Sequence, residues 1–168
     1  YMIGISKRLI AVEEYCKMAE VGILKPTDRV ELIHGEIIEM SPVGSKHASI
    51  VKKLSRILNK YFSEELTIGI QDPVKLGENN QPEPDVSVLR FRSDDYAEAH
   101  PTTEDILILM EVSDTTLQYD KEIKARLYAQ YMIPDLWIID VNKQRIEIYV
   151  RPEGGEYLKK EVKGLEDE

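Results

Sequence analysis

The chain has little cysteine and no long apolar run. Its single cysteine, Cys16, rules out an internal disulfide and fits a reducing compartment, so the expected location is the cytoplasm. No apolar run approaches the roughly 20 residues that a membrane span needs, and no signal-peptide pattern opens the sequence. Long Gly/Ser linkers, internal repeats and low-complexity tracts are also missing, so one domain, 1–168, is expected and no membrane association is predicted.

Acidic residues outnumber basic residues in this chain. The chain has 22 Lys and Arg against 31 Asp and Glu, a formal charge of -9. Such a surface does not favour general affinity for nucleic acid, which needs clustered cations. Metal sites are themselves acidic, however, and a bound cation reverses the local field. The net charge therefore argues against a nucleic-acid partner without excluding a nuclease.

Several enzyme motifs are absent. The histidines, at 34, 47 and 100, lack the HExxH spacing of zinc hydrolases. No P-loop or dinucleotide-binding glycine pattern occurs, which excludes most nucleotide-binding enzymes. Cys16 lies on an apolar helix face without a nucleophile signature, so it is assigned to the core.

Hydrophobic periodicity predicts helices and strands in alternation. Helices are expected at 11–21, 46–62 and 120–131. Their predicted buried sides include Ala19 in the first helix, Ile57 and Tyr61 in the second, and Ile123 and Tyr128 in the third. Strands are expected at 30–33, 36–40, 68–76, 84–89, 106–112, 136–140, 145–150 and 157–162. A helix joins the strands 106–112 and 136–140, so that pair should be parallel and buried on both faces. The order predicts an α/β fold in which helices flank a mixed β-sheet.

The strand 106–112 carries the first candidate for chemistry. It is apolar on both faces until Glu111 near its end, where a buried charge is costly unless it is compensated. Asp85 begins another short apolar strand. Two carboxylates at the ends of neighbouring strands could share Mg²⁺. The alternative is that Asp85 caps a turn and Glu111 pairs with a lysine.

A lysine in the following helix is the second candidate. Lys124 borders the buried side of the helix 120–131, from which it could fold back to Glu111 and stabilise charge on a reacting phosphate. The alternative is a surface lysine whose alkyl chain packs along apolar side chains while its amine stays in water, which is the commoner case. Lys121 is a weaker candidate for the same role.

Three further polar residues are candidates for the same cleft. Glu31, in the first hairpin, could add a third carboxylate, and Gln71 could orient a water or a phosphate. For both, an ordinary edge-strand residue is at least as plausible. His47 lies in the first turn of a helix, where anions are favoured, although a packing role is the simpler interpretation.

Taken in order, these residues resemble the Uma-type (DUF820-like) endonuclease family of the PD-(D/E)XK superfamily. The matching phrases are 12–15 (VEEY), 29–37 (RVELIHGEI), 84–86 (PDV), 111–115 (EVSDT), Tyr119-Asp120 with Lys124, 128–129 (YA) and 133–140 (IPDLWIID). The resemblance covers a core of about 10–151. It implies a restriction-endonuclease-like fold.

The resemblance also implies a metal-dependent phosphodiesterase site. Asp85 and Glu111 would bind Mg²⁺ or Mn²⁺ with help from the Val112 carbonyl, while a lysine positions or activates water and Glu31 adds an acidic contact. The sequence departs from the superfamily at Ser113, where Glu-x-Lys would place a lysine. Lys124 matches the helix lysine of the family.

The resulting hypothesis is a Mg²⁺-dependent DNA endonuclease, a homodimer by analogy with restriction enzymes. A competing hypothesis is a catalytically weak or inactive nuclease-fold module that binds nucleic acid or a protein partner; Ser113 and the acidic charge favour it. A glycosidase using Asp85 and Glu111 ranks last, because no aromatic platform lies near those positions.

Overall fold

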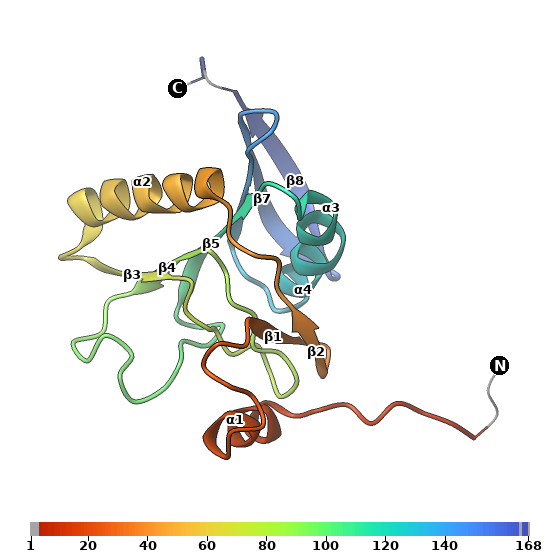
Figure 1. The fold of residues 1–168 in the computed structure, drawn as a ribbon. Helices are drawn as coiled ribbons and strands as arrows, with labels where there is room; N and C mark the ends of the chain where they lie inside the picture. The colour runs from red at the N-terminus through yellow and green to blue at the C-terminus, as the bar shows by residue number, and fades with distance from the viewer. Residues whose placement is uncertain (1–3, 165, 168) are drawn as a thin grey trace.

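The fold is built on a six-stranded mixed sheet (Figure 1). It is described here from a computed structural model for residues 4–164 and 166–167. The strands follow the spatial order β3-β4-β5-β6-β7-β8. Their bounds are β3 Leu66–Ile70, β4 Val86–Arg90, β5 Ile106–Ser113, β6 Asp135–Asp140, β7 Arg145–Glu153 and β8 Glu156–Lys163. All neighbours in this sheet pair antiparallel except β5 and β6, which are parallel.

A helical crossover produces the parallel pair. It consists of α3 (Leu117–Tyr119), a π-helical segment η1 (Asp120–Lys124) and α4 (Ala125–Gln130). Such a connection returns the chain to the end of the sheet at which β5 began, so the next strand runs parallel to it. The parallel β5–β6 pair and the mixed sheet flanked by helices were both predicted from the sequence and are confirmed.

Both faces of the central strands are covered. The crossover packs on one face, where Leu109, Leu127 and Leu136 belong to one core cluster. Helix α2 (Ser45–Phe62) covers the other face, where Val51 joins Met110 in a second cluster. This double burial explains why β5 is a nearly continuous apolar run.

A smaller unit lies beside the sheet and carries one wall of the site. Helix α1 (Val12–Glu20) packs against a two-stranded hairpin of β1 (Val30–Ile33) and β2 (Glu36–Glu39). The hairpin is tied to the segment that leads into β4. There, Leu32 N donates to Gln81 O at 3.3 Å, and Gln81 N donates to Leu32 O at 2.8 Å.

The structure corrects the predicted strand 68–76. Strand β3 ends at Ile70, and Gln71 has a φ of 53°, a left-handed conformation that breaks a strand. The chain then runs through 71–85 as a long connection, in which Lys75 makes an isolated bridge to Thr102. The apolar residues of 71–76 fill the core from this connection rather than from a strand.

Some predicted buried positions are also wrong. In α2, Ile57 and Tyr61 are 54% and 65% exposed, whereas Leu54 and Leu58 pack against the second core cluster. Ala19, predicted on the buried side of α1, is exposed. In the crossover, Ile123 is 40% exposed, since the π-helical segment turns Lys124 inward instead. In the part of the chain that the structure describes, no helix is both long and apolar enough to cross a bilayer.

Glu147 of β7 is a buried carboxylate surrounded by cations. Lys121 Nζ lies 2.8 Å and Arg145 Nη2 2.6 Å from Oε1, while Lys160 Nζ lies 2.9 Å from Oε2. The Tyr149 hydroxyl donates to Oε2 at 2.6 Å. Burial alone would raise the pKa of Glu147, but hydrogen bonds from Lys121, Tyr149 and Lys160 outweigh it and hold the pKa at about 2.

This lowered pKa makes stability dependent on pH. A carboxylate with a depressed folded-state pKa stabilises the fold above its ordinary value of 4.5, and that stability is lost as the pH falls toward 2. We expect Glu147→Gln to lower the free energy of unfolding at pH 7 by roughly 2 kcal/mol, since the partly exposed cations are screened by water. Urea unfolding at pH 7, 4 and 3 should show the difference shrinking below pH 4.5. Glu161→Gln, at an exposed carboxylate of β8, is the control. A difference that does not change with pH would contradict this prediction.

Candidate functional site

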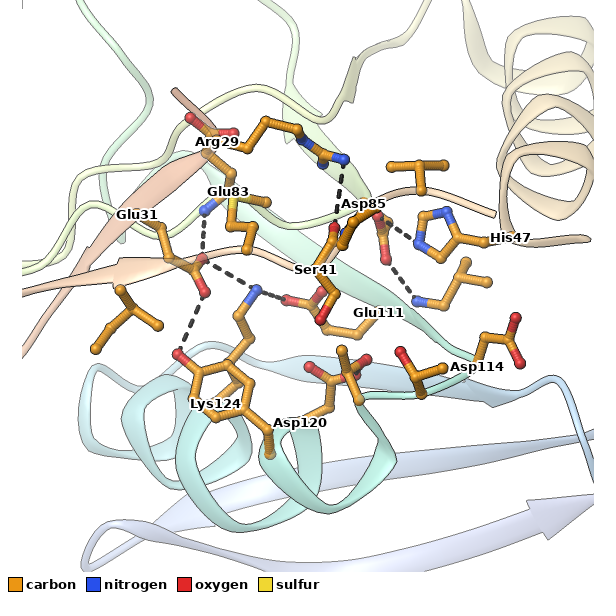
Figure 2. Close-up of a pocket in the computed structure, with 18 of the residues that line it drawn as sticks. Arg29, Glu31, Ser41, His47, Glu83, Asp85, Glu111, Asp114, Asp120 and Lys124 are labelled. Carbon is orange, nitrogen blue, oxygen red and sulfur yellow. Dashed lines mark hydrogen bonds and ion pairs between the residues drawn. The ribbon is translucent and has the colours of Figure 1, made fainter. Parts of the chain in front are cut away.

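A cleft of about 370 Å³ lies where the hairpin, the start of α2, the end of β5 and the crossover meet (Figure 2). The side chains that the sequence placed at one site come together here. Those lining the cleft are Glu31, His47, Asp85, Glu111, Val112 and Lys124. Gln71 does not line the cleft but hydrogen-bonds Asp85.

Glu111 is compensated by two donors rather than left alone. Its side chain is almost fully buried at the end of β5. Lys124 Nζ lies 3.1 Å from Oε1, and the Tyr128 hydroxyl donates to the same oxygen at 2.5 Å. Burial raises the pKa of Glu111 well above its ordinary range, and the Lys124 charge opposes that rise. Both donors come from the crossover, so the parallel topology is what brings them to the strand end.

Lys124 bridges two carboxylates that come from different sheets. Its Nζ lies 3.1 Å from Glu111 Oε1 and 3.1 Å from Glu31 Oε2 (Figure 2). Burial would lower the pKa of Lys124, but the charges of Glu111, Glu31 and Asp120 outweigh it and raise the pKa. In this arrangement Lys124 is therefore an ammonium group that donates hydrogen bonds.

The π-helical segment determines which side chains of the crossover face the cleft. Wider helical turns of this kind are frequent at functional sites. Asp120 and Lys124, at the two ends of η1, are both buried. Tyr128 follows Lys124 at the same four-residue spacing and is fully buried. The three polar groups thus form one row along the helix.

Both carboxylate oxygens of Asp85 accept hydrogen bonds. The backbone N–H of Val112 donates to Oδ2 at 2.8 Å, and Gln71 Nε2 donates to Oδ1 at 3.3 Å. His47 Nε2 lies 3.0 Å from Oδ1. Burial raises the pKa of Asp85, yet the bonds from His47 and Val112 outweigh it and leave the pKa below its usual value. Asp85 is therefore an ionised and firmly oriented carboxylate.

The contact with Asp85 also changes the pKa of the His47 imidazole. Its hydrogen bond with Asp85 raises the pKa of His47 against the lowering effect of burial. His47 lies in the first turn of α2, where the sequence favoured a packing role. The structure instead places its ring on a cleft carboxylate.

Glu31 forms the hairpin side of the cleft. The Glu83 backbone N–H donates to Oε2 at 3.1 Å, and the Tyr119 hydroxyl donates to Oε1 at 3.3 Å. Glu83 itself lines the cleft, and burial together with the Glu31 charge raises its pKa. A third and a fourth carboxylate therefore face the same space.

Ser113 occupies the position where the superfamily pattern expects a lysine. It is fully buried, and its hydroxyl donates to Asp120 Oδ2 at 2.6 Å; Thr116 Oγ1 also donates to that oxygen, at 2.7 Å. Burial raises the pKa of Asp120. Lys121, the weaker lysine candidate, pairs with Glu147 rather than with Glu111. Of the two candidate lysines, Lys124 is the one in the cleft.

Sequence reasoning missed Asp120 and Tyr128 as site residues. Tyr128 was assigned to the buried side of its helix and Asp120 to the helix start; both belong to phrases that match the family, but neither was given a role at the site. A signal for both was available, because each lies four residues from Lys124 and shares its helix face. A buried carboxylate such as Glu111 also needs more than one donor, which directs attention to hydroxyls on that face.

The donor set suits a hard cation. Carboxylate and carbonyl oxygens are the ligands that Mg²⁺ prefers, and this ion commonly keeps several waters and binds only one or two carboxylates. Asp85, Glu111 and the Val112 carbonyl offer such ligands. Among residues 4–164 and 166–167, no three His, Cys, Asp or Glu side chains form a ready-made metal cluster. The chain would therefore supply two carboxylates and one backbone carbonyl, and water and phosphate would supply the rest.

Comparison with known proteins places the chain in a family described as nucleases. Residues 12–168 match the Uma2 family model, described as "Putative restriction endonuclease". A crystal structure from Anabaena variabilis ATCC 29413, described as "a putative nuclease belonging to DUF820", matches with a TM-score of 0.68 and 18% identity, over 91% of this chain and 83% of that one. This likeness confirms the restriction-endonuclease-like fold. No curated protein matches the chain.

Proposed function

The chain belongs to the Uma2 family of restriction-endonuclease-like proteins, and on that premise we propose that it is a divalent-metal-dependent endonuclease that hydrolyses phosphodiester bonds in DNA. One observation carries the proposal. The Lys124 ammonium contacts Glu111 in the cleft that Asp85 also lines, so two carboxylates and a cation meet without a lysine at position 113.

In this proposal each residue has a distinct task. Asp85 and Glu111 would hold Mg²⁺ or Mn²⁺ with the Val112 carbonyl, and the ion would supply a water of lowered pKa and positive charge beside the phosphate. The buried Lys124 ammonium donates a hydrogen bond to an oxygen of the reacting group, because a fixed charge shielded from solvent stabilises developing negative charge. Glu31 holds the ammonium in place from the opposite wall.

His47 and Gln71 act on Asp85 in this scheme. Both contact Oδ1, which leaves the orientation of the carboxylate determined from the protein side. Their contacts support a positioning role, as expected for residues behind a metal ligand. Direct binding of substrate by these two side chains stays a prediction, as does the homodimer.

Removing the metal tests the proposal. Supercoiled plasmid and single-stranded DNA should be nicked or cut in Mg²⁺ or Mn²⁺, with no cleavage in EDTA and recovery when Mg²⁺ is added in excess, because the metal supplies the activated water. Gel analysis of the products measures the effect. Cleavage that persists in EDTA would contradict the mechanism. No cleavage with any metal, together with retained DNA binding, would favour the nuclease-fold binding module.

A further inference from the structure

Helix α2 has a charge opposite to that of the protein as a whole. Its 18 residues include five cations, Lys46, Lys52, Lys53, Arg56 and Lys60, and no Asp or Glu. The whole chain carries a formal charge of -9. All five cations are exposed, and none forms an ion pair with a residue that the structure describes. These cations form a positively charged surface that no described ion pair neutralises.

Four of these cations follow one line along the helix. Lys46, Lys53, Arg56 and Lys60, with Ser49 between the first two, are spaced by three or four residues, so they share one side of α2. We call Lys46, Lys53, Arg56 and Lys60 the basic stripe. At 1.5 Å per residue the stripe extends about 21 Å.

The stripe is fixed relative to the cleft. Val51 is buried on the sheet and Leu54 and Leu58 pack against the same cluster, so the helix cannot rotate. His47, in the first turn, contacts Asp85. The stripe therefore starts beside the cleft and leads away from it along α2, toward the end that connects to β3 (Figure 1).

Aromatic side chains lie at the far end of the stripe. Tyr61 and Phe62 are exposed, with ring centroids 6.5 Å apart. Lys60 Nζ lies 5.2 Å from the centre of the Tyr61 ring. A cation next to an exposed ring is suited to contact with the sugar and base of a nucleic acid as well as with phosphate.

We propose that the basic stripe of α2 is a binding surface for the phosphate backbone of duplex DNA outside the cleft. This inference rests on the proposed function and adds where the uncut part of the substrate lies. Cations that form no ion pair with the described residues attract phosphates and release the counterions condensed on them. At 3.4 Å per base pair, 21 Å corresponds to about six base pairs on one side of the cleft. The contacts are to backbone, so they are independent of sequence.

A membrane surface fits the same helix less well. Helices that lie in a membrane interface insert an apolar face into the lipid. In α2 that face is already packed on the sheet through Val51, and the exposed apolar groups Ile57, Tyr61 and Phe62 are confined to its second half.

The test uses binding without cleavage. Affinity for a fluorescent 24-base-pair duplex is measured by anisotropy in Ca²⁺ as a function of salt, for the parent and for the triple variant Lys53→Gln/Arg56→Gln/Lys60→Gln. We expect Kd to rise at least about 10-fold, and the slope of log K against log salt to fall by about 2 to 3, near 0.9 per cation lost. A six-base-pair duplex should bind weakly to both proteins.

A matched control removes the same charge elsewhere. The variant Lys25→Gln/Lys143→Gln/Arg151→Gln neutralises three exposed cations far from α2 in sequence and should keep the parental slope. Equal effects of the two triple variants would overturn the inference, as would preferential binding of the parent to phosphatidylserine vesicles. If the stripe variant loses affinity but the parent never cleaves in Mg²⁺ or Mn²⁺, the binding surface stands and the proposed function fails. If the parent cleaves and both variants bind alike, the proposed function stands and the binding surface on α2 fails.

Discussion

Lys124→Met should lower the rate of metal-dependent DNA cleavage by at least about 100-fold, because the variant lacks the fixed positive charge that we propose acts on the reacting phosphate. The same change should lower the free energy of unfolding by about 3 to 5 kcal/mol, since Glu31 and Glu111 are left buried without their shared cation. Plasmid nicking and urea unfolding measure the two effects separately.

Two further variants keep this prediction testable. Lys124→Met/Glu31→Gln removes one cation and one anion together, so it should regain part of the stability without regaining cleavage. Lys121→Met is the matched control from the same helix. Its amine pairs with Glu147, so it should lose stability but keep most of the cleavage rate. Parental cleavage by a folded protein that lacks Lys124 would disprove the assigned role.

Asp85→Asn should lower the cleavage rate by at least about 1000-fold while the fold is retained. The change removes the charge that we propose binds the metal but preserves the size of the side chain, and an amide oxygen can still accept from the Val112 N–H. Nicking in Mg²⁺ and Mn²⁺ measures the rate. Its amide nitrogen replaces the oxygen that faces Gln71 and His47, so the melting temperature should fall by several degrees without loss of the fold.

The control for this prediction is Asp95→Asn. Asp95 is an exposed aspartate in a left-handed backbone conformation that asparagine tolerates, and it lies outside the cleft. It should cleave at the parental rate. Substantial cleavage by Asp85→Asn would remove Asp85 from the metal site and leave Glu111 as its remaining acidic ligand.

The sheet could be predicted where the hydrophobic pattern is unambiguous. The apolar runs at β5 and β6, with a helix between them, determine a parallel pair buried on both faces. The pattern failed after Ile70, because alternating apolar residues in 71–76 resemble a strand although Gln71 adopts a left-handed conformation. Hydrophobic periodicity indicates which side chains are buried. It does not show whether a strand or an irregular loop buries them.

The site was predictable in its charges but less so in its geometry. Glu111 required compensation, and Lys124 on the next helix was a candidate to provide it. A regular helical wheel, however, placed Ile123 inside, whereas the π-helical segment buries Lys124 and exposes Ile123. The contact of His47 with Asp85 joins residues from different elements, a tertiary effect that no local pattern contains.

The bridging position of Lys124 also constrains how this sequence can vary. One ammonium neutralises Glu31, from the hairpin, and Glu111, from the main sheet. A natural chain without this lysine would bury two repelling anions, so its loss should be accompanied by a neutral residue at position 31 or 111. The three positions should therefore covary as a single unit across related chains, and inactive descendants should be recognisable by losing them together.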